Sequence, residues 1–145
     1  MKLQKATELA LYSVLEFAAH PTTQVSAAEI AEKYGVSPHH LAKVLRELGR
    51  AGLVESTRGV GGGYRFAGNA KRLTLFDVIE LFETLGPDAD GHEAATPGER
   101  ALASVTSEID EIAKATFRSI TVDTMLKLLA REGRPADREL AVREV

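Results

Sequence analysis

The sequence predicts a mainly α-helical fold with one small β-hairpin. Apolar residues recur three and four positions apart along several segments, which is the spacing of amphipathic helices. Residues 53–66 combine a β-branched run, a glycine-rich tip and a Tyr-x-Phe return, a pattern typical of a two-stranded hairpin. A length of 145 residues fits one domain with an appended element.

Three helices are expected before the hairpin. Their predicted ranges are residues 4–19, 27–34 and 38–51. Ser26 and Glu29 form a capping box for the second helix, and Gly35 closes it. Ser37 caps the third helix, with Pro38 at its first position. Two short helices joined by a tight turn indicate a helix-turn-helix.

The predicted hairpin follows directly after the second helix of this motif. A hairpin in that place is the wing of a winged helix-turn-helix, which we expect over residues 1–85. Glycine permits positive φ at the tip and lets the backbone approach a partner closely. Arg58 and Arg65 flank the tip and indicate a polyanionic partner, so the sequence favours a DNA-binding domain.

The C-terminal part predicts three more helices and a loop. Their expected ranges are residues 74–85, 99–118 and 122–130, with a flexible loop at 86–98 and a charged tail at 133–145. The long helix carries a narrow apolar seam suited to pairing with another helix. The seam consists of Leu102, Val105, Ile109, Ile112 and Thr116.

We expect the seam to pair with a second copy, which assigns residues 99–132 to dimerisation. Packing of the seam on the same subunit is the alternative. A two-fold homodimer would hold two recognition helices about one DNA turn apart, facing a pseudo-palindromic operator in double-stranded DNA.

The formal net charge of −3 conceals an uneven distribution. Residues 1–72 hold 10 Lys/Arg and 6 Asp/Glu, a balance of +4, whereas residues 73–145 hold 8 and 15, a balance of −7. DNA affinity depends on local neutralisation of phosphates, so an acidic chain remains compatible with DNA binding. A basic face that is merely solvated is the alternative reading.

Several other functions are disfavoured by the residues. The sequence lacks a bilayer-spanning apolar run and a signal peptide, so no membrane partner and a cytoplasmic location are expected. The run at 59–63 lacks the Lys-Ser/Thr of a phosphate-binding loop. His39 and His40 are adjacent on a helix and point about 100° apart, so they cannot chelate one metal ion. No catalytic constellation is recognisable, which argues against an enzyme.

Residues 52–64 read Gly-Leu-Val-x-Ser-x-Arg-Gly-x-x-Gly-Gly-Tyr, which resembles the wing of the IscR/NsrR family (Rrf-two type) of bacterial regulators. The opening Met-Lys-Leu, Ser26-x-x-Glu29-Ile-Ala and Ile120-Thr121-Val122 are also similar, and the resemblance covers roughly residues 1–130. It implies a homodimeric winged-helix transcription factor, often a repressor, that responds to iron–sulfur status, nitric oxide or redox stress.

The resemblance also implies roles for single residues. Arg58 corresponds to an arginine inserted into the minor groove, and Tyr64 to a support of the hairpin. Arg46 and Arg50 would touch the DNA backbone or acidic neighbours. The residues expected to contact DNA are Ser37, His39, His40, Lys43, Arg46, Arg58, Gly59, Gly61, Gly62 and Arg65.

The chain departs from this family by having no cysteine. Sensing relatives hold a 2Fe-2S or 4Fe-4S cluster on three cysteines in the loop before the long helix. Alignment on that loop puts Ala89, Ala95 and Ala101 at those positions. Either chance or natural loss explains the alanines, or cysteines were replaced to obtain a cluster-free form. For a chain with this sequence, which has no cysteine, we expect no cofactor.

Two alternatives to a DNA-binding repressor remain open at this point. One is a protein-interaction adaptor that keeps the winged scaffold without binding DNA. The other is a regulator that binds a small ligand between the long helix and the DNA-binding domain, although the sequence shows no polar cluster marking such a site.

Overall fold

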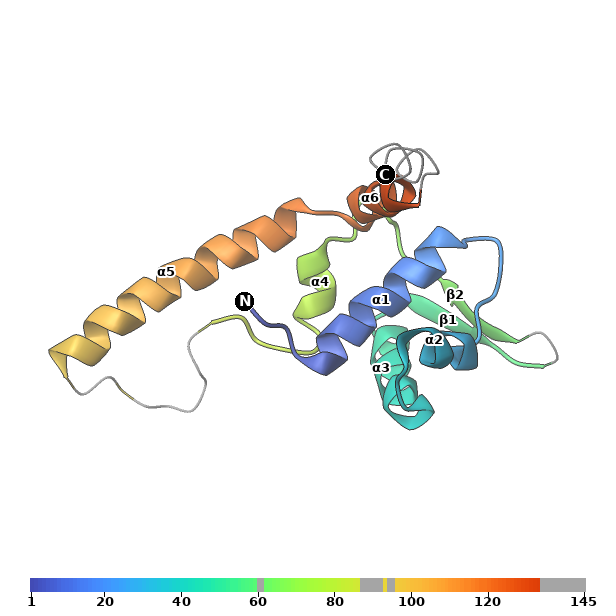
Figure 1. Ribbon diagram of the computed structural model, residues 1–145, viewed down its shortest axis with the longest axis horizontal. Coiled ribbons are helices and arrows are strands. Elements are labelled where there is room, and N and C mark those ends of the chain that lie inside the picture. Colours follow the sequence, from blue (N-terminus) through green and yellow to red (C-terminus); the bar gives the residue numbers. More distant parts are fainter. Residues whose placement is uncertain (60–61, 87–92, 94–95, 134–145) are drawn as a thin grey trace, which may run out of the picture.

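The computed structural model describes residues 1–59, 62–86, 93 and 96–133. Six helices and two strands occur in these residues (Figure 1). In chain order they are α1 (Lys5–Ala19), α2 (Ala27–Tyr34), α3 (Pro38–Arg50), β1 (Val54–Thr57), β2 (Gly63–Phe66), α4 (Leu75–Ile79), α5 (Pro97–Ser119) and α6 (Val122–Glu132). This arrangement confirms the predicted fold class, a helical protein with one antiparallel hairpin.

The first three helices begin and end where their local sequence dictates. Ser26 and Glu29 form both hydrogen bonds of the capping box at the start of α2. Gly35 takes the left-handed conformation (φ 61°) that ends α2. The Ser37 side chain accepts a hydrogen bond from the His40 backbone N–H at the start of α3, where Pro38 occupies the first turn. The predicted helix-turn-helix is therefore confirmed.

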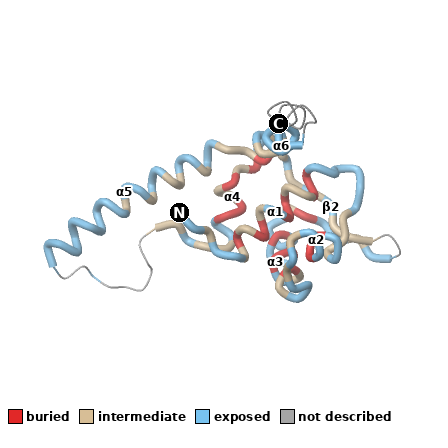
Figure 2. The backbone as a smooth tube through the Cα atoms, viewed as in Figure 1, coloured by how far each residue is buried: buried red, intermediate tan, exposed pale blue. Residues whose placement is uncertain are grey.

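One hydrophobic core joins α1, α2, α3 and the hairpin. Phe17 of α1 is 0% exposed and belongs to the same buried cluster as the apolar stripe of α3. Figure 2 shows buried segments, in red, in both helices. The buried residues of α3 are the predicted ones, namely Leu41, Val44, Leu45 and Leu48. This packing leaves the opposite side of α3 exposed to solvent.

A third segment extends the hairpin. β1 and β2 pair in the register Val54↔Phe66 to Thr57↔Gly63. On the other side of β2, the Val25 N–H donates to the Tyr64 carbonyl (3.0 Å) and the Tyr64 N–H donates to the Val25 carbonyl (2.9 Å). The segment before α2 therefore holds the base of the wing in place.

α4 is shorter than the sequence predicted. We expected this helix to reach residue 85, but it ends at Ile79. The chain then continues as a turn, and the Glu83 carboxylate accepts hydrogen bonds from the Gln4 N–H (2.8 Å) and the Thr7 hydroxyl. This tertiary contact with the start of α1 falls within the segment that the sequence predicted to continue α4.

α5 begins two residues before the predicted position, because Thr96 and Glu99 form a capping box. Its C-terminal end is fixed to the domain, since the Leu75 N–H donates to the Ile120 carbonyl (2.9 Å). Toward its N-terminus α5 projects away from the other helices (Figure 1).

α6, which the sequence places with α5 in the expected dimerisation unit over 99–132, packs against the winged domain. Val122 is 0% exposed and belongs to the core cluster, which Leu126 also contacts. The apolar side of this helix thus covers the winged domain and contributes to its core. Most of the predicted loop at 86–98 and the tail beyond Gly133 lie outside the described residues.

Candidate nucleic-acid interface

The solvent face of α3 carries positive charge. Burial of the apolar stripe turns Lys43, Arg46 and Arg50 outward, and all three are exposed. Ser37 and His39 are exposed at the N-terminal end of the same helix. An α-helix presented in this way fits the width of the DNA major groove.

The two neighbouring histidines lie in different surroundings. His39 is exposed, whereas His40 is half-buried and its Nε2 atom is enclosed without a hydrogen-bond partner among the described residues. In this orientation the Nε2 atom of His40 is not available to DNA. The structure therefore brings His39 to the candidate interface and holds the Nε2 atom of His40 inside.

The arginines of the interface differ in whether a carboxylate already holds them. Arg50 pairs with Glu47 (2.8 Å), and Arg65 pairs across the hairpin with Glu55 (3.3 Å). Arg58 is exposed and has no ion-pair partner in the described part of the chain. Binding of phosphates by Arg50 or Arg65 would first require their carboxylate partners to be displaced.

Three cations of this surface are exposed and without an ion-pair partner in the described residues, namely Lys43, Arg46 and Arg58. They come from α3 and from the end of β1, which are joined by only a few residues. Unpaired cations can replace condensed counterions on DNA directly, which makes this set the electrostatic centre of the interface.

The glycines of the wing are required by its backbone geometry. Gly59 has φ +106°, a conformation that residues with a side chain rarely adopt. A Cβ on Gly62 would lie 2.6 Å from the Thr57 carbonyl oxygen, and a Cβ on Gly63 would lie 2.7 Å from that of Val25. Gly61, which we also predicted to contact DNA, lies outside the described residues.

A groove of about 580 Å³ separates α3 from the hairpin. Arg46 lies on the α3 side and Ser56 on the strand side. If α3 enters a major groove and the wing the next minor groove, the sugar-phosphate strand between them must pass here. Tyr64 lines this groove and its ring stacks on that of Phe17 (5.9 Å between ring centres), so the ring takes part in packing the hairpin against α1.

The predicted seam on α5 is exposed. Its four large apolar side chains, Leu102, Val105, Ile109 and Ile112, are 66%, 55%, 57% and 61% exposed. The half-buried positions of the same helix fall on another face, at Ser107, Asp110, Ala113, Lys114 and Phe117. At about 100° per residue, that face is roughly a third of a turn from the seam. The alternative, in which the seam packs on its own subunit, is not the arrangement of this structure.

The residues do not fit the iron–sulfur cluster that the family resemblance implies. The chain has no thiolate ligand because it has no cysteine. Ala101 is exposed on the first turns of α5, whereas Ala89 and Ala95 lie outside the described residues. Within the described part, no group of three or more histidine, aspartate or glutamate side chains is arranged to hold a metal ion.

Sequence reasoning missed two carboxylates that shape this surface, Glu47 and Glu55. Glu55 was not recognised as the partner of Arg65, because cross-strand partners become known only with the register. The Glu47–Arg50 pair could have been found from its three-residue helical spacing.

No described helix is both long enough and apolar enough to cross a membrane.

The structure combines an exposed basic helix, a glycine-rich wing and a third segment that supports this wing. These features define a winged-helix, DNA-binding class of protein. The chain belongs to the Rrf2 family of transcriptional regulators: residues 3–128 match that family, which is described as iron-dependent transcriptional regulators. Members of this family are regulators, and the chain is accordingly not an enzyme.

Relatives support the same assignment. The chain is 54% identical over 143 residues to BadM of Rhodopseudomonas palustris, whose name describes a helix-turn-helix transcriptional regulator; the match covers 95% of this chain and 89% of BadM. Among solved structures, IscR of T. potens has a TM-score of 0.75 at 26% identity, covering 92% of each chain. CymR, the global cysteine regulator of B. subtilis, has a TM-score of 0.72 at 27% identity, covering 88% of this chain and 98% of CymR.

Proposed function

We propose that the protein is a homodimeric, sequence-specific DNA-binding repressor that works without an iron–sulfur cluster. The observation that supports DNA binding is the set of unpaired cations on one side of the domain, Lys43, Arg46 and Arg58. Each dimer would present this surface twice and would bind an operator with approximate two-fold symmetry. A regulator of bacterial genes acts in the cytoplasm, and that location belongs to the same proposal.

Dimerisation is supported by the exposed seam of α5. Burying a large aliphatic side chain contributes roughly 1.5–3 kcal/mol, so four such side chains on each of two copies supply substantial association energy. The seam also lies on the face of α5 that its own subunit leaves uncovered. A second copy with the same seam is the simplest cover for it.

Repression is the expected outcome of occupancy. A dimer bound across a promoter excludes other proteins from the same base pairs, without any need for a further surface. Because the chain has no thiolate ligand, we propose that iron–sulfur chemistry does not control this occupancy.

Two measurements test the proposal. Sedimentation equilibrium should give twice the chain mass of 15.6 kDa, and Ile109→Asp should yield monomers. Ser104→Asp is the matched control, because Ser104 is exposed on α5 but lies outside the seam. A monomeric parent protein would contradict the dimer.

The second measurement is a gel shift on DNA fragments from upstream of the protein's own gene, followed by transcription in vitro. Retarded fragments and reduced transcript are expected. A protein that shifts no fragment would favour the adaptor alternative, and increased transcript would contradict repression.

A further inference from the structure

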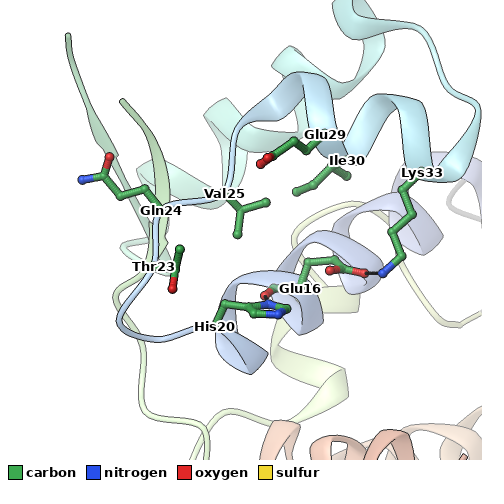
Figure 3. Close-up of a pocket in the computed structure, with 8 residues that line it drawn as sticks. All are labelled: Glu16, His20, Thr23, Gln24, Val25, Glu29, Ile30 and Lys33. Carbon is green, nitrogen blue, oxygen red and sulfur yellow. Dashed lines mark hydrogen bonds and ion pairs between the residues drawn. The ribbon is translucent and has the colours of Figure 1, made fainter. Parts of the chain in front are cut away.

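A pocket of about 330 Å³ opens between the end of α1, the segment before α2, and α2 itself (Figure 3). Its volume is within the range of small-molecule sites, roughly 300–1,000 Å³. The pocket is separate from the DNA-binding surface and from the α5 seam, because neither the unpaired cations nor the seam residues line it. We call it the α1–α2 pocket. Its lining consists of Glu16, His20, Thr23, Gln24, Val25, Glu29, Ile30 and Lys33.

The pocket combines an apolar floor with hydrogen-bond acceptors at two ends. Val25 and Ile30 form the floor, and Ile30 is only 1% exposed. Figure 3 shows Glu29 on one side of this floor and His20 on the other. The His20 Nδ1 atom lies 3.0 Å from the Glu16 carbonyl oxygen, which can only accept, so Nδ1 carries the proton. In the tautomer with the proton on Nδ1, Nε2 is the hydrogen-bond acceptor.

The charges that line the pocket leave one carboxylate in excess. Glu16 pairs with Lys33 and accepts a hydrogen bond from the Tyr34 hydroxyl (2.7 Å). Burial raises the pKa of Glu16, but the hydrogen bonds from Lys33 and Tyr34 outweigh it and hold the pKa below its usual value. This carboxylate is therefore ionised and neutralised by Lys33. Glu29 accepts a hydrogen bond from the Ser26 N–H (2.9 Å) and has no cationic partner in the described residues.

We propose that the α1–α2 pocket binds a short aliphatic diamine. One ammonium group donates to the Glu29 carboxylate, the methylene chain lies on Val25 and Ile30, and the second ammonium group donates to Nε2 of His20. The excess of acceptors at both ends disfavours an anionic ligand, and the apolar floor disfavours a bare cation.

The pocket shares a wall with the wing. Val25 lines the pocket through its side chain and holds β2 through its two backbone hydrogen bonds with Tyr64. Gly63 packs directly under the Val25 carbonyl. A ligand that shifts Val25 therefore shifts the wing relative to α3. We expect the diamine to lower operator affinity, and DNA to lower diamine affinity by the same factor. This coupling rests on the proposed function, whereas binding of the diamine does not.

Binding is tested by titrating 1,4-diaminobutane into the full-length protein and recording amide NMR spectra. Shifts are expected for residues 16–33 and for Tyr64, with a dissociation constant in the millimolar range. Glu29→Gln should weaken binding about tenfold by removing a charge-assisted hydrogen bond. This variant keeps the α2 cap, because glutamine serves equally in a capping box. Glu32→Gln, on the same helix but outside the pocket, is the matched control and should bind normally.

Two related ligands test the proposed binding mode. Butylammonium, which has only one charged end, should bind more weakly than the diamine, and butyrate should not bind. The absence of shifts with the diamine, equal loss in both glutamine variants, or preferential binding of butyrate would overturn the proposal.

The coupling is tested with operator DNA at constant ionic strength. The diamine should lower the operator affinity of the parent protein more than that of Glu29→Gln, which corrects for diamine bound to the DNA itself. An equal effect on both proteins would refute the coupling. If no DNA binds under any condition, the proposed function fails, while the NMR titration still decides whether the pocket binds the diamine.

Discussion

Removal of Arg58 should change the salt dependence of operator binding. Arg58 is exposed at the end of the first wing strand and has no ion-pair partner in the described part of the chain, so it is free to neutralise a phosphate or enter the minor groove. With Lys43 and Arg46 it gives three cations of the candidate interface that have no ion-pair partner in the described residues, hence six per dimer.

The size of the effect follows from counterion release. Six neutralised phosphates give a slope of log affinity against log salt of about −5.4, and four, after Arg58→Ala in both protomers, give about −3.6. Between about 50 and 200 mM salt, the parent protein should therefore lose about 10³ in affinity and the variant about 10².

Fluorescence anisotropy with a labelled operator, measured across this salt range, provides the assay. Arg50→Ala is the matched control. Arg50 already pairs with Glu47, so the loss of Arg50 should leave the slope of log affinity against log salt close to the parent value. A parent-like slope for Arg58→Ala, or an equal change for Arg50→Ala, would refute the assignment of the free cations.

Two other predictions concern the folded chain. Gly63→Ala would place a Cβ 2.7 Å from a backbone carbonyl oxygen, so it should lower the free energy of unfolding by about 1–3 kcal/mol. It should also weaken operator binding; urea denaturation measures the first effect and anisotropy the second. Unchanged stability would show that the wing base can shift freely. Burial raises the pKa of Glu16, but the hydrogen bonds from Lys33 and Tyr34 outweigh it and hold this pKa below its usual value. The stabilisation from Glu16 should therefore be complete above about pH 4.5 and be lost as the pH falls through the folded pKa, a loss that Glu16→Gln should abolish in thermal melts at graded pH.

Local features of the helices were predictable because neighbours in the sequence determine them. The capping boxes, the glycine that ends α2 and the buried stripe of α3 depend on residues within one or two turns. The hairpin was predictable for the same reason, since its glycine-rich tip and β-branched flank are contiguous. The hairpin stretch, residues 52–64, also carried the resemblance to one family, and the family match confirmed this resemblance.

Features that depend on distant contacts could not be predicted in this way. Glu83 is 76 residues from Thr7, and their hydrogen bond coincides with the early end of α4. Val122 was placed with the expected dimerisation helices from its position in the sequence, and only the folded structure shows that its side chain also lies in the winged-domain core. Burial of such a side chain is decided by the surfaces that meet it, and periodicity alone does not identify them.

The sequence by itself determined the class of fold, the place of the recognition helix and the wing, and the absence of a thiolate ligand. Tertiary structure alone decided that Arg65 is paired, because Glu55 faces Arg65 only in the register of the folded hairpin. It also decided that Val25 supports the wing while lining a pocket. Composition sets the charges available to a chain, whereas their free or paired state depends on distances of a few ångströms that only folding establishes.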